Sequence, residues 1–466
     1  MLFSREEVLK VTGGKLWRGE TGGDFQGVTI DSRQVKGGEL FFPLPGEKEN
    51  GHVFIPDALK RGASGSLLEE EWLSSFSREA FSPEKAIIVV ENSLRALHKL
   101  AAYHRNKFAL PVVAVTGSNG KTTTKDFIAS VLSTRYNVLK TEGNFNNHLG
   151  LPLMLLRLKK EHQAAVLELG MSGPGEIALL TTLCQPDRGV ITNIGEAHLE
   201  FLGSKGNIAK AKGELLTGMD SRGKAFLNGD DPFLGRMGSA FAGETIYYGF
   251  KTGIDLQVLE YNFTETGYIF KAVLPGGRQD DFSIPLPGKH NVYNALAAIA
   301  VGLDFSLGVE AIKEGLARST FSAMRMEKIM AKSGFWVIND AYNANPTSMQ
   351  FALQSLKEWA QTNPKIAVLG DMFELGPQAE EMHLAVGRYL AALGIDFLLT
   401  VGNLAAFIAR GAREAGLAAE KTFLANSNRE ALDCLGSLHL PGSYILVKGS
   451  RGMQMEKIVS GLLKRY

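Results

Sequence analysis

A glycine-bracketed turn between an apolar run and a helical pattern constrains this chain more than any other feature. Val112–Val115 predicts a buried strand, and Gly117 and Gly120 bracket the turn that follows it. Lys121 then opens a helical pattern. The apolar positions of that pattern are Phe127, Ile128, Val131 and Leu132. A strand, a glycine-rich turn and a helix in this order are typical of a phosphate-binding loop in a parallel α/β sheet.

The residue types in the turn suit an anion. Backbone N–H groups and a helix N-terminus point at phosphates, the Lys121 ammonium adds a mobile cation, and the Thr122 hydroxyl can ligate Mg²⁺. The strict pattern has glycine where this chain has Val115, so an ordinary glycine turn is the alternative interpretation. The residues predicted to bind nucleotide are Thr116, Gly117, Ser118, Asn119, Gly120, Lys121, Thr122 and Thr123.

The composition is that of an ordinary globular protein. The chain has 466 residues, too many for one hydrophobic core, with 45% hydrophobic and 21% charged residues. The net charge is +1, so no global charge favours nucleic acid or a membrane surface. The start of the chain is charged, and no apolar run reaches the roughly 18–20 residues of a membrane span, so a cytoplasmic protein without membrane insertion is expected. Cys184 and Cys434 fit no metal or redox spacing, and both are expected to be buried thiols.

Three α/β segments are predicted along the chain. Residues 1–95 contain short strands and turns, residues 96–318 show recurring strand–helix–strand signals, and residues 319–466 predict a separate Rossmann-like domain. No Gly-x-Gly-x-x-Gly run follows the strands of the last segment, so no dinucleotide is assigned to it. The main predicted strands are 39–44, 86–90, 165–169, 189–194, 335–338, 366–369, 397–401 and 444–447.

Three side chains of the middle segment could serve a nucleotide. Glu168 ends a predicted strand, where a carboxylate could hold the Mg²⁺ of the nucleotide or could simply be solvated. His198 follows the next predicted strand and could ligate a metal, cap a loop or pack in a core. Lys212 lies in a predicted helix, and its position alone indicates only a solvated surface charge.

Amide side chains form two further candidate sites. Asn144 and Asn147 lie in an amide-rich turn that could hold a carboxylate or phosphate, or could simply build the turn. Asn291 and Asn294 lie at the start of an alanine-rich helix. An asparagine there is usually a cap, yet its amide can equally pair with an adenine edge.

The last segment carries a polar connection between a strand and a helix, residues 340–348. Asn345 suits the N-cap and Pro346 the first helical position, but Asp340 and Asn343 exceed what capping requires.

Three cations accompany this connection. Lys448 and Arg451 follow the strand 444–447 and could bind a carboxylate or phosphate. Arg325 lies at the junction of the second and third segments, where it could reach a phosphate when domains close or merely pair with Glu327.

Taken together and in this order, these motifs resemble the Mur ligase family, the ATP-dependent amide ligases that assemble the peptide of bacterial cell-wall precursors. The resemblance spans essentially the whole chain. Thr116–Thr122 looks like the family's phosphate loop, which accounts for Val115. Three other runs resemble the members that add D-alanyl-D-alanine to a UDP-N-acetylmuramoyl-tripeptide, namely Asp340–Ser348, Gly370–Gly376 and Val447–Arg451.

The resemblance implies three domains, one for a uridine nucleotide, one for ATP and one that completes the site. It implies two Mg²⁺ ions, the first held by Thr122 and Glu168 and the second by His198. Lys212 matches a carbamylated lysine whose added carboxylate bridges to metal, and this replaces the surface-charge interpretation because an ammonium cannot ligate a cation. The residues with implied catalytic roles are Lys121, Glu168, His198 and Lys212.

Binding roles follow from the same resemblance. Asn291 and Asn294 match adenine-side residues, and Arg325 and Asp340 match residues that meet ATP after closure. Ser32 and Arg33 align with a uridine-side turn. The residues expected to bind the substrates are Ser32, Arg33, Asn144, Asn147, Asn343, Asn345, Ser348, Lys448 and Arg451.

The implied activity is ligation of the two small-molecule substrates, UDP-N-acetylmuramoyl-tripeptide and D-alanyl-D-alanine, through an acyl phosphate, with ADP and phosphate as products. A monomer is expected. The alternatives are a ligase for another amino acid or for folate, an ATP-driven switch that makes no bond, and an inactive scaffold. Residues 1–95 argue against a folate ligase, which lacks the uridine domain, and the four catalytic candidates argue against a scaffold. The diamino acid at the third position of the tripeptide stays open.

Overall fold

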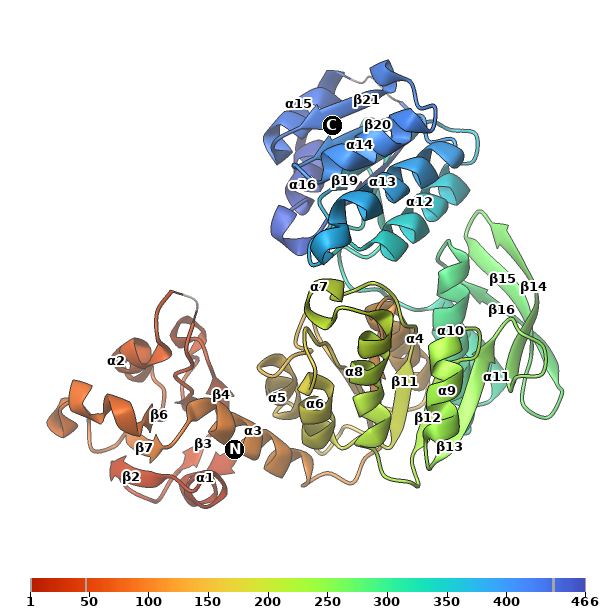
Figure 1. Ribbon diagram of the computed structural model, residues 1–466. Coiled ribbons are helices and arrows are strands. Elements are labelled where there is room, and N and C mark those ends of the chain that lie inside the picture. Colours follow the sequence, from red (N-terminus) through yellow and green to blue (C-terminus); the bar gives the residue numbers. More distant parts are fainter. Residues whose placement is uncertain (1, 47, 438–440, 466) are drawn as a thin grey trace. The chain divides into compact units, whose positions relative to one another are not determined.

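The protein is described here as a computed structural model covering residues 2–46, 48–437 and 441–465 (Figure 1). The chain forms two compact units. The first unit comprises Met1–Leu110, Thr141–Gln163 and Leu179–Gln185. The second unit comprises Pro111–Lys140, Ala164–Ala178 and Pro186–Tyr466.

The first unit is built on a five-stranded sheet of order β2-β7-β6-β5-β4. Its strands β4 to β7 run parallel, and β2 is antiparallel to β7. The sheet strands are β2 (Lys15–Arg18), β4 (Gly27–Thr29), β5 (Glu39–Phe41), β6 (Gly65–Glu69) and β7 (Ala86–Val90). A two-stranded pair adds β1 (Phe3–Ser4) and β3 (Asp24–Phe25). The helices of this unit include α1 (Arg5–Thr12), α2 (Ile55–Lys60), α3 (Ser93–Arg105) and α5 (Gly150–Leu155).

One buried cation in the first unit binds several backbone carbonyls. Arg105, the last residue of α3, is 7% exposed and donates to several backbone carbonyls. Its Nε bonds the carbonyl of Cys184 at 3.0 Å, and its Nη1 bonds that of Phe108 at 2.7 Å. The guanidinium thereby satisfies carbonyls at the end of α6 (Glu176–Cys184) that lack an intrahelical partner.

Replacing Arg105 by methionine is expected to destabilise the first unit by about 2–4 kcal/mol, because several buried carbonyls lose their donors. Thermal unfolding followed by circular dichroism would show a lowered first transition. The matched control is Arg95→Ala in the same helix, since Arg95 is exposed and pairs with the exposed Glu91. Equal melting temperatures for the two variants would contradict the structural role of Arg105.

The second unit begins with a nine-stranded sheet of order β16-β15-β14-β13-β12-β11-β8-β10-β9. Strands from β9 to β14 pair in parallel, and β14, β15 and β16 form an antiparallel extension. The strands are β8 (Val112–Thr116), β9 (Val138–Lys140), β10 (Ala164–Glu168), β11 (Arg188–Ile191), β12 (Lys224–Asn228), β13 (Glu244–Gly249), β14 (Leu256–Thr264), β15 (Gly267–Val273) and β16 (Gln279–Ile284).

Helices cover both faces of the nine-stranded sheet, which explains why β8 is buried along its whole length. On one face, α4 (Lys121–Leu132) packs against α10 (Lys289–Asp304) and α11 (Val309–Ala317) around Phe127 and Ile128. The remaining helices of this part are α7 (Leu199–Leu202), α8 (Lys205–Thr217) and α9 (Pro232–Ala240). The chain passes from β8 to β9 and β10 on one side and then to β11 on the other, so β8 lies at the switch point where open α/β sheets bind ligands.

The rest of the second unit is a six-stranded sheet of order β17-β18-β22-β19-β20-β21, parallel except for β17. Its strands are β17 (Glu327–Met330), β18 (Trp336–Asn339), β19 (Lys365–Gly370), β20 (Phe397–Val401), β21 (Thr422–Ala425) and β22 (Tyr444–Lys448). Its helices are α12 (Pro346–Ala360), α13 (Ala379–Ala392), α14 (Ala405–Glu414), α15 (Asn428–Ser437) and α16 (Glu456–Arg465). Two separate apolar clusters fill the space on the two faces of the sheet.

The predicted α/β fold class with three parallel-sheet parts is confirmed. The antiparallel extension β14–β16 was not predicted. The boundaries at 95 and 318 stay predictions, although α3 spans the first of them. One prediction was wrong: Cys184 is buried, but Cys434 is only half-buried. Among the described residues, no helix combines the length and hydropathy needed to cross a bilayer.

Candidate functional site

The glycine turn lies at the carboxyl end of β8 and leads into α4. Gly120 occupies the left-handed region at φ +78° and forms the N-cap of α4, as a turn directly into a helix requires. Gly117 has φ +147°, and a Cβ at this position would lie 1.9 Å from Thr192 Oγ1. Both positions therefore require glycine because of the local backbone conformation, and not because the loop needs to be flexible.

The loop after β11 holds the phosphate loop in place. Thr192 Oγ1 donates to the Asn119 carbonyl at 2.6 Å, and Asn193 Oδ1 accepts from the Asn119 N–H at 3.0 Å. Ser118 Oγ accepts from the Gly195 N–H at 2.8 Å. Thr192 and Asn193 were not predicted as site residues. The signal that could have found them is a pair of polar residues directly after a buried strand next to β8.

Lys121 is held inside this loop. Its Nζ donates to the Gly117 carbonyl at 2.8 Å. Burial lowers the pKa of the Lys121 ammonium; the negative charge of Glu168 works against this shift, and the positive charge of Arg325 adds to it. An anion beside Lys121 would remove the cost of this buried charge.

Lys212 is not the surface cation that its position in the sequence suggested. It lies on α8, is only 1% exposed, and no hydrogen bond or ion pair reaches its amine from the part of the chain that the structure describes. Burial, together with the like charge of Lys121, lowers the pKa of Lys212 well below its usual range. The lowered pKa favours the neutral form of the Lys212 amine.

Glu168 and Thr122 are buried beside the same loop, at 2% and 3% exposure. Glu168 is the last residue of β10, the neighbour of β8, and its charge acts on Lys121. Glu168 and Arg325 thus come from distant segments and both act on the Lys121 ammonium, which in turn acts on Lys212. Within residues 2–46, 48–437 and 441–465, no cluster of three or more His, Cys, Asp and Glu side chains suits a metal ion.

His198 lies at the N-cap of α7 with φ +61°. Its Nδ1 is 2.6 Å from Glu374 Oε2, so Nε2 is the ring nitrogen left for another partner. The hydrogen bond from His198 lowers the pKa of Glu374 against the opposing effect of burial. Glu374 was not singled out from the sequence, although it lies in the run Gly370–Gly376.

Asn291 and Asn294 form an internal chain of amides at 2% and 5% exposure. Asn291 Nδ2 donates to the Pro287 carbonyl, and Asn294 Nδ2 donates to Asn291 Oδ1 at 2.9 Å. Asn294 Oδ1 accepts from Thr124 Oγ1 at 3.1 Å, which ties α10 to the first turn of α4.

A pocket of about 430 Å³ opens beside the phosphate loop. Asn119 and Gly120 line it on the side of the loop. Its other walls include Asp230, His290, Tyr293, Asn294 and Phe351. Tyr293 donates its hydroxyl to Asp230 Oδ2 at 2.7 Å, and the His290 ring stacks on Phe351 with centroids 4.5 Å apart. Flat apolar faces and a carboxylate acceptor are suited to a nucleoside.

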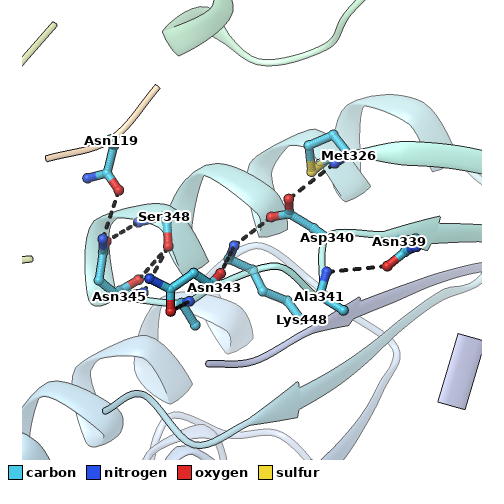
Figure 2. Close-up of polar contacts among 10 residues, drawn as sticks. Asn119, Met326, Asn339, Asp340, Ala341, Asn343, Asn345, Ser348 and Lys448 are labelled. Carbon is cyan, nitrogen blue, oxygen red and sulfur yellow. Dashed lines mark hydrogen bonds and ion pairs between the residues drawn. The ribbon is translucent and has the colours of Figure 1, made fainter. Parts of the chain in front are cut away.

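The connection after β18 forms a polar cluster, shown in Figure 2. Lys448 Nζ lies 2.6 Å from Asp340 Oδ2 and donates to the Asn343 carbonyl at 2.8 Å. Asp340 Oδ1 accepts from the Met326 N–H at 3.1 Å. Because β22 lies between β18 and β19, the end of β22 brings Lys448 to a segment more than a hundred residues earlier in the chain.

Asn345 and Ser348 form a capping box at the start of α12. Asn345 Oδ1 accepts from the Ser348 N–H at 2.9 Å, and Ser348 Oγ accepts from the Asn345 N–H at 2.9 Å. The predicted N-cap role of Asn345 is confirmed, with Pro346 as the first helical residue. Its Nδ2 also donates to Asn119 Oδ1 at 2.8 Å (Figure 2).

The two predicted arginines take different positions. Arg325 is half-buried, with its guanidinium carbon 4.0 Å from the centre of the Tyr342 ring. Arg451 is exposed and pairs with Glu456 at 3.0 Å. The positive charge of Arg325 thus lowers the pKa of Lys121, while the salt bridge of Arg451 joins two residues that are close in the sequence.

Comparisons with known proteins agree across the whole chain. Residues 24–105, 115–302 and 324–451 match the models of the Mur ligase family catalytic domain, the Mur ligase middle domain and the Mur ligase glutamate ligase domain. The chain is 42% identical over 439 residues to the UDP-N-acetylmuramoyl-tripeptide–D-alanyl-D-alanine ligase of Bacillus subtilis strain 168, covering 94% of this chain and 93% of the relative. The chain belongs to the Mur ligase family.

Solved Mur ligases share the fold. MurF from Acinetobacter baumannii superposes with a TM-score of 0.88 at 33% identity, covering 99% of both chains. The MurF ligase of Thermotoga maritima, solved in complex with ADP, gives a TM-score of 0.81 at 28% identity, covering 94% of this chain and 97% of that one.

In this Mur ligase the remaining predicted substrate residues lie in the first unit. Arg33 is exposed and donates two bonds to Asp31, and the Ser32 hydroxyl lowers the pKa of Asp57. Asn147 Oδ1 accepts from the Gly150 N–H at 2.8 Å and so supports the start of α5, while Asn144 is exposed. Their roles toward a substrate stay predictions.

The loop that carries Glu374 is fixed by buried polar groups. His383 is fully buried, accepts from the Met372 N–H at Nε2 (3.0 Å) and lies 2.6 Å from the Ala379 carbonyl at Nδ1, so the ring is neutral. Asp371 Oδ1 accepts from the Ala405 N–H at 2.6 Å, and Ser450 Oγ accepts from the Phe373 N–H at 2.8 Å.

Acidification should weaken this loop. Burial lowers the pKa of His383 in the folded protein, while hydrogen bonding to Ala379 and the charge of Asp371 oppose the shift. The pKa of a histidine in the unfolded chain is about 6.5. As the pH falls below this value, the unfolded chain takes up a proton before the folded protein does, so the free energy of unfolding decreases. We expect the melting temperature of His383→Gln to change less between pH 7 and pH 5 than that of the wild type. Equal pH dependence in the two proteins would contradict this.

Proposed function

We propose that this protein is an ATP-dependent ligase that joins D-alanyl-D-alanine to the terminal carboxylate of UDP-N-acetylmuramoyl-tripeptide. The observation that carries the proposal is the half-buried Lys121 in its glycine turn, on which Glu168 and Arg325 act and which itself acts on Lys212, in a chain that matches such a ligase over 94% of its length. We further propose that it acts as a monomer in the cytoplasm.

ATP would lie with its phosphates on the turn and its nucleoside in the adjoining pocket. The Lys121 ammonium and the N–H groups at the start of α4 suit the phosphates. Asp230 could accept from the ribose, and the faces of His290 and Tyr293 could pack on the base, because these side chains line the pocket. Asn291 and Asn294 support the wall of this pocket through their internal amide chain. Asp340 would contribute to ATP binding indirectly, by holding Lys448 in place through their ion pair.

Two Mg²⁺ ions fit the side chains around the turn. The Thr122 hydroxyl and the Glu168 carboxylate are hard oxygen ligands, and Mg²⁺ bound to nucleotides typically takes only one or two carboxylates from the protein. His198 would offer Nε2 to the second ion, because Glu374 occupies Nδ1. When bound, the ions neutralise phosphate charge and polarise the transferred phosphoryl group.

Carbamylation of Lys212 fits its surroundings. The neutral amine attacks carbon dioxide, a C–N bond forms, and a proton is released to give a carbamate. The new group is an anion in place of a cation, so it would attract Lys121 where the ammonium repels it. It would also supply oxygen ligands for metal.

The reaction proceeds in two steps. A carboxylate oxygen of the tripeptide attacks the γ-phosphorus of ATP, the bond to the β-phosphate oxygen breaks, and ADP leaves an acyl phosphate. The free amine of D-alanyl-D-alanine then attacks the acyl carbon, loses a proton and expels phosphate. The half-buried cations Lys121 and Arg325 would reduce the repulsion between the anions in the first step. Asn343 and Ser348 lie on the connection 340–348, which we place next to the dipeptide, and we assign Arg451 to the same substrate. The first unit with Ser32, Arg33, Asn144 and Asn147 would hold the UDP-linked acid.

Lys121→Ala should lower turnover by about 100- to 1000-fold, because one preorganised cation at the transferred phosphate is lost. The measurement is ADP release with both substrates, alongside the melting temperature, which should change little. Lys210→Ala on α8 is the control, since that lysine is exposed. Ligation at a near-normal rate by Lys121→Ala would refute the assigned role.

Lys212 should carry the mass of one bound carbon dioxide in native mass spectrometry, and Lys212→Ala should lose this mass and its activity. Added short-chain carboxylic acids should restore part of the activity, because they can replace the carbamate. Lys210→Ala should behave as the wild type in both tests. Full activity of Lys212→Ala without added acid would exclude a functional carbamate.

The amine substrate that the enzyme accepts distinguishes between the ligases of this family. ADP release should require D-alanyl-D-alanine and should not occur with glutamate or single amino acids. Tripeptides with either diamino acid at position three should be compared in the same assay. ATP hydrolysis without an amine or a UDP-linked acid would instead support a nucleotide switch.

A further inference from the structure

The segment that connects the two sheets of the second unit is attached to helix α4. This connecting segment, residues 318–326, runs from the end of α11 to the start of β17. Phe321 packs edge-to-face on Phe127 of α4, with ring centroids 5.0 Å apart. The next residue, Ser322, donates to Asp126 Oδ2 from its N–H at 3.0 Å and from its Oγ at 2.9 Å. Two consecutive residues of the segment thus bind two consecutive residues of the helix that begins at the phosphate loop.

The group that holds Ser322 is a buried charge. Asp126 and Lys125 are each only 1% exposed. Asp126 Oδ1 lies 3.1 Å from Lys125 Nζ and 3.2 Å from Lys140 Nζ, and Lys125 Nζ also lies 3.5 Å from Ser322 Oγ. Removing such ions from water costs about as much free energy as their pairing returns, so the cluster adds little to stability. What the carboxylate does provide is a fixed pair of hydrogen bonds to the connecting segment.

The backbone is strained on both sides of Arg325. Met324 has φ +60° and Met326 has φ +53°, in the left-handed region that residues with a side chain rarely adopt. Each such residue costs about 1–3 kcal/mol and persists only where the surrounding structure enforces it. Two of them within three residues give the segment a sharply defined turn, and Arg325 lies at its centre. The turn therefore sets the direction in which this side chain leaves the backbone.

Bonds to the six-stranded sheet enforce the turn from its other side. The Met326 N–H donates to Asp340 Oδ1 at 3.1 Å (Figure 2). The Met324 carbonyl accepts from the Tyr342 N–H at 3.3 Å, and the Tyr342 ring lies against the Arg325 guanidinium. The segment around Arg325 is thus fixed by α4 before the turn and by the connection after β18 at the turn itself.

We infer that Asp126 and Ser322 are positioning residues for Arg325. Helix α4 carries Lys121 at its first position, and through Asp126 it also holds the segment that presents Arg325. One helix therefore places both cations. In agreement with this, the charge of Arg325 lowers the pKa of Lys121. The inference rests on the proposed function, in which both cations serve the attack on ATP, and Asp126 and Ser322 act in it through Arg325 without touching a substrate.

The attachment can be weakened in the full-length protein without removing the buried carboxylate. Ser322→Ala loses the Oγ bond to Asp126 and keeps the N–H bond, whereas Ser322→Thr keeps both. The measurement is the rate of ADP formation in a single turnover with both substrates present and enzyme in excess over ATP, because product release does not affect it. Ser322→Ala should lower this rate by roughly three- to tenfold, less than the roughly 100-fold cost of a full 1 Å misplacement. Ser322→Thr should retain the wild-type rate.

Two further variants separate positioning from a general loss of structure. Ser319→Ala is the matched control, because the Ser319 hydroxyl belongs to the same segment but donates to the Gly315 carbonyl of α11 at 2.9 Å. It should leave the rate unchanged. In an Arg325→Ala background, Ser322→Ala should have no further effect on the rate, because there is no guanidinium left to position. A purely structural defect would lower the rate by the same factor in both backgrounds.

Different results would overturn different claims. A wild-type rate in Ser322→Ala, or an equal loss in the presence and absence of Arg325, would refute the inference alone. A wild-type rate in Arg325→Ala would refute both the inference and the role assigned to that arginine, while the ligase activity would stand. Failure of the wild type to form ADP with both substrates would overturn the proposed function and, with it, this inference.

Discussion

Two lysine side chains held out of water beside one another set the requirements of the whole site. Lys121 and Lys212 both lose hydration, and the charge of Lys121 further disfavours a charge on Lys212. In a region of low dielectric constant such a pair is unfavourable unless anions compensate. Glu168 supplies part of this compensation. The triphosphate of ATP and a carbamate on Lys212 would supply the rest, so the physical requirement and the proposed chemistry coincide.

The topology explains how these groups meet. β8 lies between β10 and β11, so the turn after β8, the carboxylate at the end of β10 and the polar loop after β11 occupy one edge of the sheet. The six-stranded sheet uses the same arrangement, because β22 lies between β18 and β19 and places Lys448 beside Asp340. In both sheets a strand lies between two strands that do not adjoin it in the sequence, and this brings distant segments together at the carboxyl ends.

Much of the framework could be predicted from the sequence. The phosphate loop was recognisable because a strand, two glycines and Lys121 lie within a dozen residues, and Asn345-Pro346 marked the start of a helix. The strands of the antiparallel extension were missed because they are partly exposed and carry no motif. Thr192, Asn193 and Glu374 were missed for another reason. They are common polar residues, and their importance arises only from contacts with Asn119 and His198 far away in the chain.

The sequence by itself determined the order of the elements, the glycine turn that faces an anion and the family to which the chain is related. These features are local: they depend on spacing within a strand, a turn and a helix. The tertiary structure alone decided that Lys212 is buried beside Lys121, that Glu374 holds Nδ1 of His198 and that Asn345 reaches the phosphate loop. Burial and charge coupling depend on which distant segments pack together, and a linear pattern of residues does not contain that information.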